Sequence, residues 1–180
     1  FSAAGAPIGG EFLVNTQTEN GQFSPTITGL AGGGFVVTWY DYSGTLGDAS
    51  SASIKAQIFS AAGARVGGEF LVNTETYSAQ GYPTITGLAG GGFVVTWEDF
   101  SGTLGDASDT SIKAQIFSAT GAKVGGEFLV NTQTSGEQLY PTITGLAGGG
   151  FVVTWSDWSG TLGDASGTSI KAQIFSATGA

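Results

Sequence analysis

Short apolar segments alternate along the chain with stretches rich in glycine, serine and threonine. In the first third of the chain these segments are Pro25–Leu30, Phe35–Asp41, Ser53–Phe59 and Gly67–Thr74. Short segments that are rich in β-branched and aromatic side chains and bounded by glycine-rich turns are typical of β-strands. Apolar positions nowhere follow a helical period for more than one turn. The pattern therefore predicts an all-β fold built from units of four antiparallel strands.

The same succession of segments returns every 58 residues. The units are 1–58, 59–116 and 117–174, and residues 175–180 begin a fourth. At 45 of the 58 positions all three copies carry the same residue. A four-stranded repeat of this length is typical of a β-propeller blade, so we expect three blades in the chain. A β-solenoid and a β-sandwich are the alternatives, although solenoid coils are shorter and a sandwich does not repeat its strands so closely.

The chain begins and ends in the middle of a predicted blade. We expect blades at about 24–74, 82–132 and 140–180, of which the last lacks its fourth strand. Residues 1–16 have the sequence of a fourth strand, so this strand is expected to come from another chain. Two chains joined head to tail would then form a homodimer with a six-bladed ring. Continuation of the blade into further sequence is the alternative.

The residues that the chain lacks exclude several kinds of function. It contains no Cys, His or Met, which excludes Ser-His-Asp and Cys-His nucleophiles, the usual zinc sites and disulfides. A net charge of −9 argues against nucleic-acid binding, which requires a basic surface. No apolar run is long enough for a transmembrane helix. We therefore expect a protein that is not an enzyme, binds no nucleic acid, has no membrane span and requires no cofactor.

The 13 positions that differ among the copies lie mainly in two of the connections between strands. These connections follow the second and the fourth strand, and in a meandering sheet both lie on the same side. Exposed loops accumulate substitutions, whereas hairpins that need glycine do not. The alternative interpretation is a binding surface whose residues have diversified.

Aromatic and acidic residues at the start of one variable loop form the candidate ligand site. Equivalent positions in the three copies hold Tyr42, Phe100 and Trp158, preceded by Asp41, Asp99 and Asp157. An aromatic ring covers the apolar face of a sugar and a carboxylate accepts its hydroxyl groups, so this pairing suits a glycan. Tyr82 and Tyr140 are expected to line the same groove between blades. The alternative is that the rings only pack against the adjacent loop.

The same loops are the candidate metal site. Each copy carries two aspartates seven residues apart, namely Asp41 and Asp48, Asp99 and Asp106, and Asp157 and Asp164. With Ser43 and Thr45 they place oxygen atoms along one loop, loosely as calcium loops do, although the bidentate Glu of an EF-hand is absent. Two carboxylates for each loop predict at most a weak calcium site.

Charged and aromatic residues inside the predicted strands have structural interpretations. Lysines of the third strand face acidic residues across the sheet and predict ion pairs; they are Lys55, Lys113 and Lys171. Glutamates of the fourth strand are expected on an exposed edge, where charge opposes edge-to-edge pairing; they are Glu11, Glu69 and Glu127. Tryptophans of the second strand are expected in the core between blades; they are Trp39, Trp97 and Trp155.

The motifs of the unit resemble those of a tandem-repeat family in very large secreted bacterial proteins. Units of that family read P-x-I-x-x-L-x-x-G-G-F-V-V-x-W, then I-x-A-Q-x-F, then G-x-E-F-x-V-N-T, and the chain contains all three. Such proteins often also carry RTX-type calcium repeats or cadherin-like modules. The resemblance covers essentially the whole chain and implies an adhesin-like protein, secreted or at the cell surface, without catalytic residues. The loop that reads D-G-S-G in the family reads SGTLGDAS here, so the resemblance does not support a metal site.

These observations predict a non-enzymatic, extracellular structural or adhesive β-propeller module. The alternatives are a lectin-like propeller that binds carbohydrate through its variable loops, and an engineered symmetric repeat protein. The plan of the blades is also similar to that of sialidases. However, Arg65 is the single arginine of the chain, and a sialidase needs a cluster of arginines for the substrate carboxylate.

Overall fold

The computed structural model describes residues 5–7 and 9–180, which form eleven β-strands and no helix. Within these ranges there is accordingly no helix that could span a lipid bilayer. The strands are β1 (Gln22–Gly29), β2 (Phe35–Asp41), β3 (Ser53–Phe59), β4 (Arg65–Leu71), β5 (Gln80–Gly87), β6 (Phe93–Asp99), β7 (Ser111–Phe117), β8 (Lys123–Leu129), β9 (Gln138–Gly145), β10 (Phe151–Asp157) and β11 (Ser169–Phe175).

The strands form three antiparallel sheets in which neighbours in sequence are neighbours in space. The first sheet contains β1–β4, the second β5–β8 and the third β9–β11. The strands β2 and β3 have the predicted bounds and pair along their whole length, from Phe35 with Phe59 to Asp41 with Ser53. The predicted all-β unit of four antiparallel strands is thus confirmed in the first two sheets, and the third sheet has three strands.

The first strand of each sheet begins earlier than predicted. β1 starts at Gln22 and continues through a bulge between Phe23 and Thr26. Inside the bulge, Ser24 has a φ of 49° and Pro25 follows it. A bulge interrupts the ladder of hydrogen bonds, so the proline, which has no N–H, is accommodated there. The sequence pattern did not indicate that a strand continues on the far side of this proline.

The fourth strand is shifted toward the N-terminus relative to its predicted position. It was expected at Gly67–Thr74 and lies at Arg65–Leu71. Gly67 has a φ of 70° and lies where the pairing of β3 with β4 changes register. The chain stays close to β3 after the strand ends, because the Val72 N–H donates to the Ile54 carbonyl at 2.8 Å.

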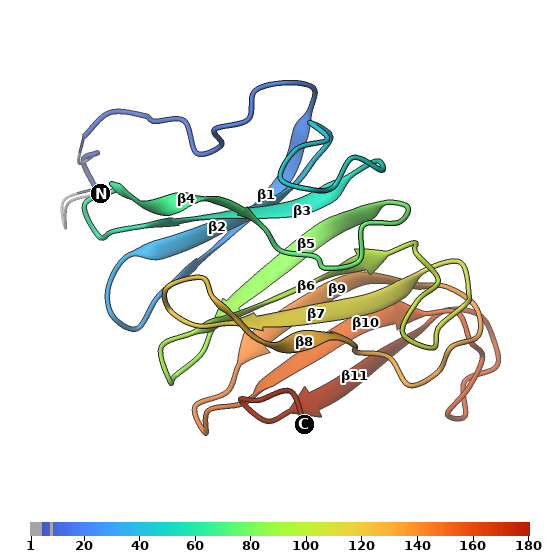
Figure 1. The fold of residues 1–180 in the computed structure, drawn as a ribbon. Helices are drawn as coiled ribbons and strands as arrows, with labels where there is room; N and C mark the ends of the chain where they lie inside the picture. The colour runs from blue at the N-terminus through green and yellow to red at the C-terminus, as the bar shows by residue number, and fades with distance from the viewer. Residues whose placement is uncertain (1–4, 8) are drawn as a thin grey trace.

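The three sheets are stacked, with β1, β5 and β9 as neighbouring strands (Figure 1). Ile54, Ile58 and Val72 of the first sheet pack against Phe93 and Trp97 of the second. Equivalent residues form a similar core between the second and third sheets. Because both of its faces are covered, the second sheet buries every residue of β6 and β7. The predicted position of the strand tryptophans in the core between sheets is confirmed for Trp97 and Trp155, whereas Trp39 is buried in a separate cluster beside Val14 of the N-terminal segment.

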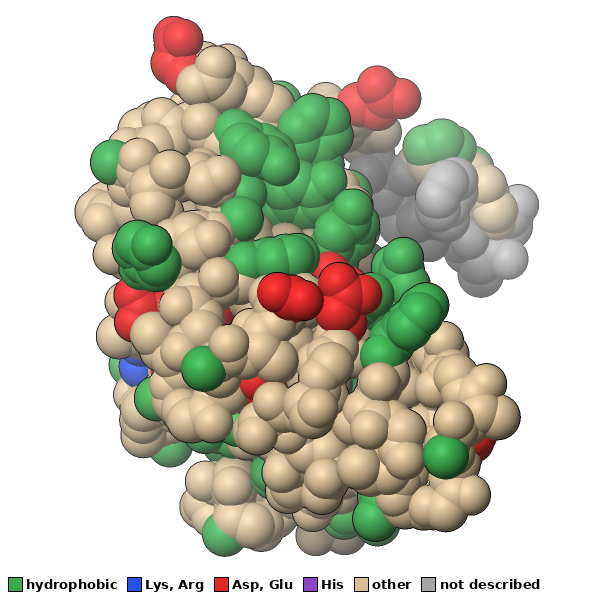
Figure 2. Space-filling view, turned by 90° about the vertical axis from the view of Figure 1, so that its right-hand side faces the viewer, with side chains coloured by type: hydrophobic (Ala, Val, Ile, Leu, Met, Phe, Trp, Pro, Cys, Tyr) green, Lys and Arg blue, Asp and Glu red, His purple; other side chains and the backbone are tan. Residues whose placement is uncertain are grey.

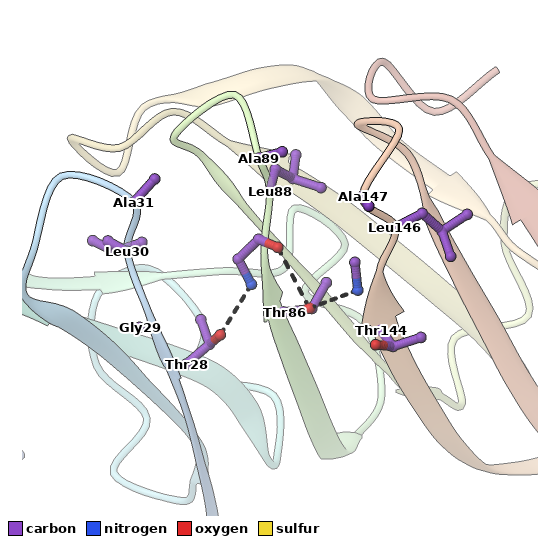
Figure 3. A pocket seen from close by; sticks show the side chains of 12 residues that line it. Thr28, Gly29, Leu30, Ala31, Thr86, Leu88, Ala89, Thr144, Leu146 and Ala147 are labelled. Carbon is purple, nitrogen blue, oxygen red and sulfur yellow. Dashed lines mark hydrogen bonds between the residues drawn. The ribbon is translucent and has the colours of Figure 1, made fainter.

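The strands β1, β5 and β9 are called the inner strands, and the close contact between them depends on glycine and threonine. The Gly87 N–H donates to Thr28 Oγ1 at 3.0 Å, and the Gly145 N–H donates to Thr86 Oγ1 at 2.9 Å (Figure 3). A Cβ at Gly87 would lie 2.6 Å from the Gly29 carbonyl oxygen, so a larger residue would separate the two strands. The ends of the three strands surround an open hollow of about 440 Å³ (Figure 3).

The described part of the N-terminal segment is not part of a sheet within the single chain. The predicted strand at 1–16 includes residues 1–4 and 8, which lie outside the described residues. Its described part, residues 5–7 and 9–16, contains no strand. The closed propeller ring and its number of blades therefore stay predictions.

Candidate functional site

The aspartates at the ends of β2, β6 and β10 are paired with the lysines of β3, β7 and β11. Lys55 Nζ lies 2.7 Å from Asp41 Oδ1 and donates to Ser43 Oγ and Thr45 Oγ1 at 2.6 Å each. The pairs Lys113–Asp99, at 2.8 Å, and Lys171–Asp157, at 2.7 Å, repeat this contact. The predicted ion pairs are thus confirmed, although they lie in the interior, where the side chains of Lys55 and Asp41 are fully enclosed.

The carboxyl group of Asp41 is held in its ionised form. Burial alone would raise its pKa, but hydrogen bonds from Lys55 and from the Ser43 hydroxyl and N–H lower the pKa below its ordinary value. Asp157 has a lowered pKa for the same reasons, with Lys171 and Ser159 as donors. These aspartates are therefore fixed counter-ions, and the geometry does not prepare them for proton transfer.

The structure separates the two aspartates of the candidate metal site. Asp48 has other partners than Asp41: its Oδ1 accepts from the Ser50 N–H and hydroxyl, and its Oδ2 accepts from Asn73 Nδ2 at 2.9 Å. Asp106 repeats this arrangement with Asn131. Residues 5–7 and 9–180 contain no group of three or more acidic side chains placed to share a metal ion. The ammonium group of a lysine lies among the oxygen atoms that the sequence analysis assigned to calcium, and calcium binding stays a prediction.

The structure also separates the aromatic rings from the aspartates beside them in sequence. Tyr42, Phe100 and Trp158 are 44%, 40% and 54% exposed, whereas the preceding aspartates are buried. Consecutive residues of an extended chain point to opposite sides, so the ring faces solvent when the carboxylate faces the lysine. These carboxylates are therefore not available to accept hydroxyl groups of a sugar held on the rings.

A row of aromatic rings does form on this side of the molecule, with partly different members. Tyr40 lies 5.8 Å from Tyr42, 5.6 Å from Tyr82 and 5.5 Å from Phe23, measured between ring centroids. Tyr82 lies 6.5 Å from Tyr140. Figure 2 shows hydrophobic side chains gathered on this face, with acidic side chains beside them. We call Phe23, Tyr40, Tyr42, Tyr82 and Tyr140 the aromatic row.

Three members of the aromatic row were predicted from the sequence, whereas Phe23 and Tyr40 were not. Both occupy positions that differ among the copies, where the second copy has Gly81 and Glu98. The signal that could have found them is the register of the bulged strand pair, in which Phe23 lies opposite Tyr40. The bulge could not be read from the sequence, so the register was not predicted.

Glu98 is a buried acid beside the aromatic row. Its Oε1 accepts a hydrogen bond of 2.7 Å from the Tyr140 N–H. Burial raises the pKa of this carboxyl, and the negative charge of Glu137 raises it further. The pKa of Tyr82 is also raised, chiefly by Tyr40 and then by burial and by Glu98. The surface that a ligand would meet here is thus aromatic, with the Glu98 carboxyl enclosed beside it.

The two ends of the stack form a second candidate surface. Ile112 and Ile116 of β7 are 0% and 3% exposed, because the third sheet covers them. Their equivalents on β11, Ile170 and Ile174, are 75% and 67% exposed. At the opposite end of the stack, Ile27 of β1 is exposed, whereas its equivalent Ile85 is buried. Each end therefore exposes part of a contact that the chain makes internally, although Val37 and Trp39 of the first sheet are buried beside Val14 of the N-terminal segment.

Comparison with known proteins does not name a family for this chain. No model of a known protein family matches it, and no curated protein matches it either. The resemblance of its motifs to secreted bacterial repeat proteins therefore stays a prediction, and the two candidate surfaces carry the functional argument.

Proposed function

We propose that the chain is a non-enzymatic structural or adhesive module whose three sheets are blades of a β-propeller, and that it functions by assembling through the open ends of its stack. One observation carries this proposal. The contact between neighbouring sheets is made twice within the chain, and apolar residues from its two halves are exposed at the ends, Ile27 at one and Ile170 and Ile174 at the other. Apolar patches of this kind on otherwise polar surfaces mark sites of association.

The chemistry of the buried polar groups supports a structural role. The charged and hydroxyl side chains around Lys55 bind one another inside the sheet, as do their equivalents in the other two copies. A catalytic acid or base has to reach a substrate, and these groups are enclosed. The extracellular setting is part of the proposal on the strength of the sequence motifs alone.

Two copies joined head to tail would place six blades in a ring. Such an interface uses different surfaces of each copy and closes only when the rotation between copies completes a circle. Multi-angle light scattering tests this. We expect a mass of about 36 kDa for two copies of 18.1 kDa. A chain that remains at 18.1 kDa at all concentrations would contradict the proposed assembly.

The aromatic row favours a second candidate function, a lectin-like module that binds carbohydrate. Exposed aromatic rings can stack on the apolar face of a sugar. A glycan array distinguishes the two functions. Reproducible binding that is lost in a Tyr82→Ala, Tyr140→Ala double variant, and retained in the control Tyr77→Ala, would support the lectin. Tyr77 is a suitable control because its ring is exposed and no ring contact joins it to the aromatic row.

A further inference from the structure

The outer edge of β11 is the place where the third sheet differs from the other two. In the first and second sheets the third strand pairs with a fourth, β3 with β4 and β7 with β8. Among the described residues, β11 pairs with β10 alone. Its other edge therefore presents unpaired backbone N–H and carbonyl groups, and such an edge readily accepts another strand.

Residues 9–16 have the sequence of a fourth strand. Within the chain they lie against the first sheet, in the place that the fourth strand of a preceding sheet would occupy. Thr16 donates its N–H to Glu69 Oε2 at 2.6 Å, as Thr74 donates to Glu127 Oε2 at 2.6 Å. Arg65 Nη2 donates to the Leu13 carbonyl at 2.6 Å. The segment thus contacts the first sheet in the way that the end of β4 contacts the second.

Ring contacts show the same equivalence. The Phe12 ring lies 5.4 Å from that of Phe59, and the Phe70 ring lies 5.6 Å from that of Phe117. Phe70 belongs to the fourth strand of the first sheet and packs against the second sheet. Phe12 therefore occupies the position of a fourth-strand residue from a sheet that would precede the first.

The charges at the two ends are complementary. Lys55 lies 3.7 Å from Glu69 as well as 2.7 Å from Asp41, and Lys113 similarly lies 3.5 Å from Glu127. Lys171 is paired with Asp157. The glutamate that the repeat would bring to Lys171 is Glu11, which is exposed in the N-terminal segment. A second copy could therefore supply the second carboxylate.

Backbone contacts extend the match. The Asn131 side chain accepts from the Ile112 N–H at 2.9 Å, and the Val130 N–H donates to the Ile112 carbonyl at 2.8 Å. The equivalent residues are Asn15, Val14 and Ile170. Asn15 is already oriented by its own hydrogen bond to the Gln17 carbonyl, at 2.7 Å.

We propose that residues 9–15 of one copy add to β11 of a second copy as its fourth strand, with Phe12 opposite Ala172 and Leu13 opposite Lys171. This inference rests on the proposed function and names the partner and the surface. Its register is that of β3 with β4, where Ala56 pairs with Phe70 and Lys55 with Leu71. The added strand, together with the first sheet behind it, covers the exposed isoleucines of β11.

Cysteine cross-linking tests the register directly, because the chain has no cysteine of its own. A Phe12→Cys copy is mixed with an Ala172→Cys copy, oxidised and examined on a non-reducing gel. We expect a disulfide-linked dimer in the mixture and little in either sample alone. A Tyr77→Cys copy mixed with Ala172→Cys is the control and should stay monomeric on the gel. Within one chain, Ala56→Cys with Phe70→Cys shows that this pair of positions can form the disulfide.

Charge reversal tests the same contact without altering the fold of the single chain. Glu11→Lys places a cation beside Lys171, so we expect at least a tenfold weaker association. Glu19→Lys makes the same change of net charge at an exposed site outside the contact, and should associate as the parent chain does. Circular dichroism should show both variants folded.

Light scattering on the same samples separates the two proposals. Association without the Phe12–Ala172 cross-link, or association that Glu11→Lys leaves unchanged, would overturn strand addition and leave the assembling module in place. A parent chain that is monomeric at every concentration would overturn both.

Discussion

The lysine in the third strand of each sheet has its ammonium group surrounded by oxygen atoms of the adjoining loop. The pairing of Lys55 with an acid could be predicted from the sequence, because the two residues belong to neighbouring strands. The enclosure was not predicted, since burial comes from the stacking of sheets and Ser43 and Thr45 reach the lysine only through the path of the loop. Because the position of the lysine ammonium group inside this loop was not predicted, the oxygen atoms of the loop were interpreted as ligands for a cation.

Removing the acid from this cluster should destabilise the protein strongly. Asp41→Asn leaves the Lys55 ammonium buried without its closest counter-charge, so we expect a loss of about 3–5 kcal/mol in the free energy of unfolding. Because the pKa of Asp41 is lowered on folding, its stabilising contribution is present above the ordinary pKa and disappears as pH falls through the lowered value. Urea unfolding at pH 7 measures the loss, with the exposed Asp109→Asn as control. Equal effects of the two substitutions would contradict the assignment.

Glu98 should have the opposite dependence on pH. Its pKa is raised in the folded state, so ionisation destabilises the fold. This destabilisation is absent where the group is protonated in both states, develops as pH rises above the ordinary carboxyl pKa, and is complete above the raised value. Glu98→Gln retains an oxygen for the Tyr140 N–H, and we expect a higher melting temperature at pH 7. The gain should vanish near pH ~3.5. A gain of the same size at both pH values would show that ionisation is not the cause.

At the scale of the elements, β2 and β3 could be predicted because their sequences are unbroken runs of strand-forming residues. β1 and β4 were displaced because each contains a bulge whose geometry depends on single residues such as Ser24 and Gly67. The same bulges set the register that brings Phe23 and Tyr40 into the aromatic row. Thus the strands could be predicted from runs of strand-forming residues. The candidate ligand surface depends on local irregularities of the backbone, which such runs do not reveal.

The inner strands should tolerate no side chain at their close contact. Gly87→Ala would place a Cβ 2.6 Å from the Gly29 carbonyl oxygen, and we expect a loss of about 1–3 kcal/mol in unfolding free energy. Gly90→Ala is the control, because a Cβ there meets no atom within 4 Å. Thermal unfolding of the two variants measures the difference, and a Gly87→Ala protein as stable as its control would show that the strands can move apart.

At the scale of the whole molecule, the repeat predicted three similar sheets, and the stacking confirms that they pack against one another. The proposed association predicts that stability depends on concentration, since anything that binds the folded chain alone raises its melting temperature. We expect the melting temperature of the parent chain to rise over a hundredfold increase in protein concentration. The Glu11→Lys variant should show a smaller rise, and parallel behaviour of the two proteins would count against the proposed contact.

The exposed ends have a consequence for how such a chain can change over generations. A duplication or deletion of one 58-residue unit adds or removes a whole sheet and leaves the two terminal surfaces as they were. Unequal recombination between nearly identical copies produces such changes easily. Such an event would change the number of sheets and keep both surfaces of the contact proposed between chains.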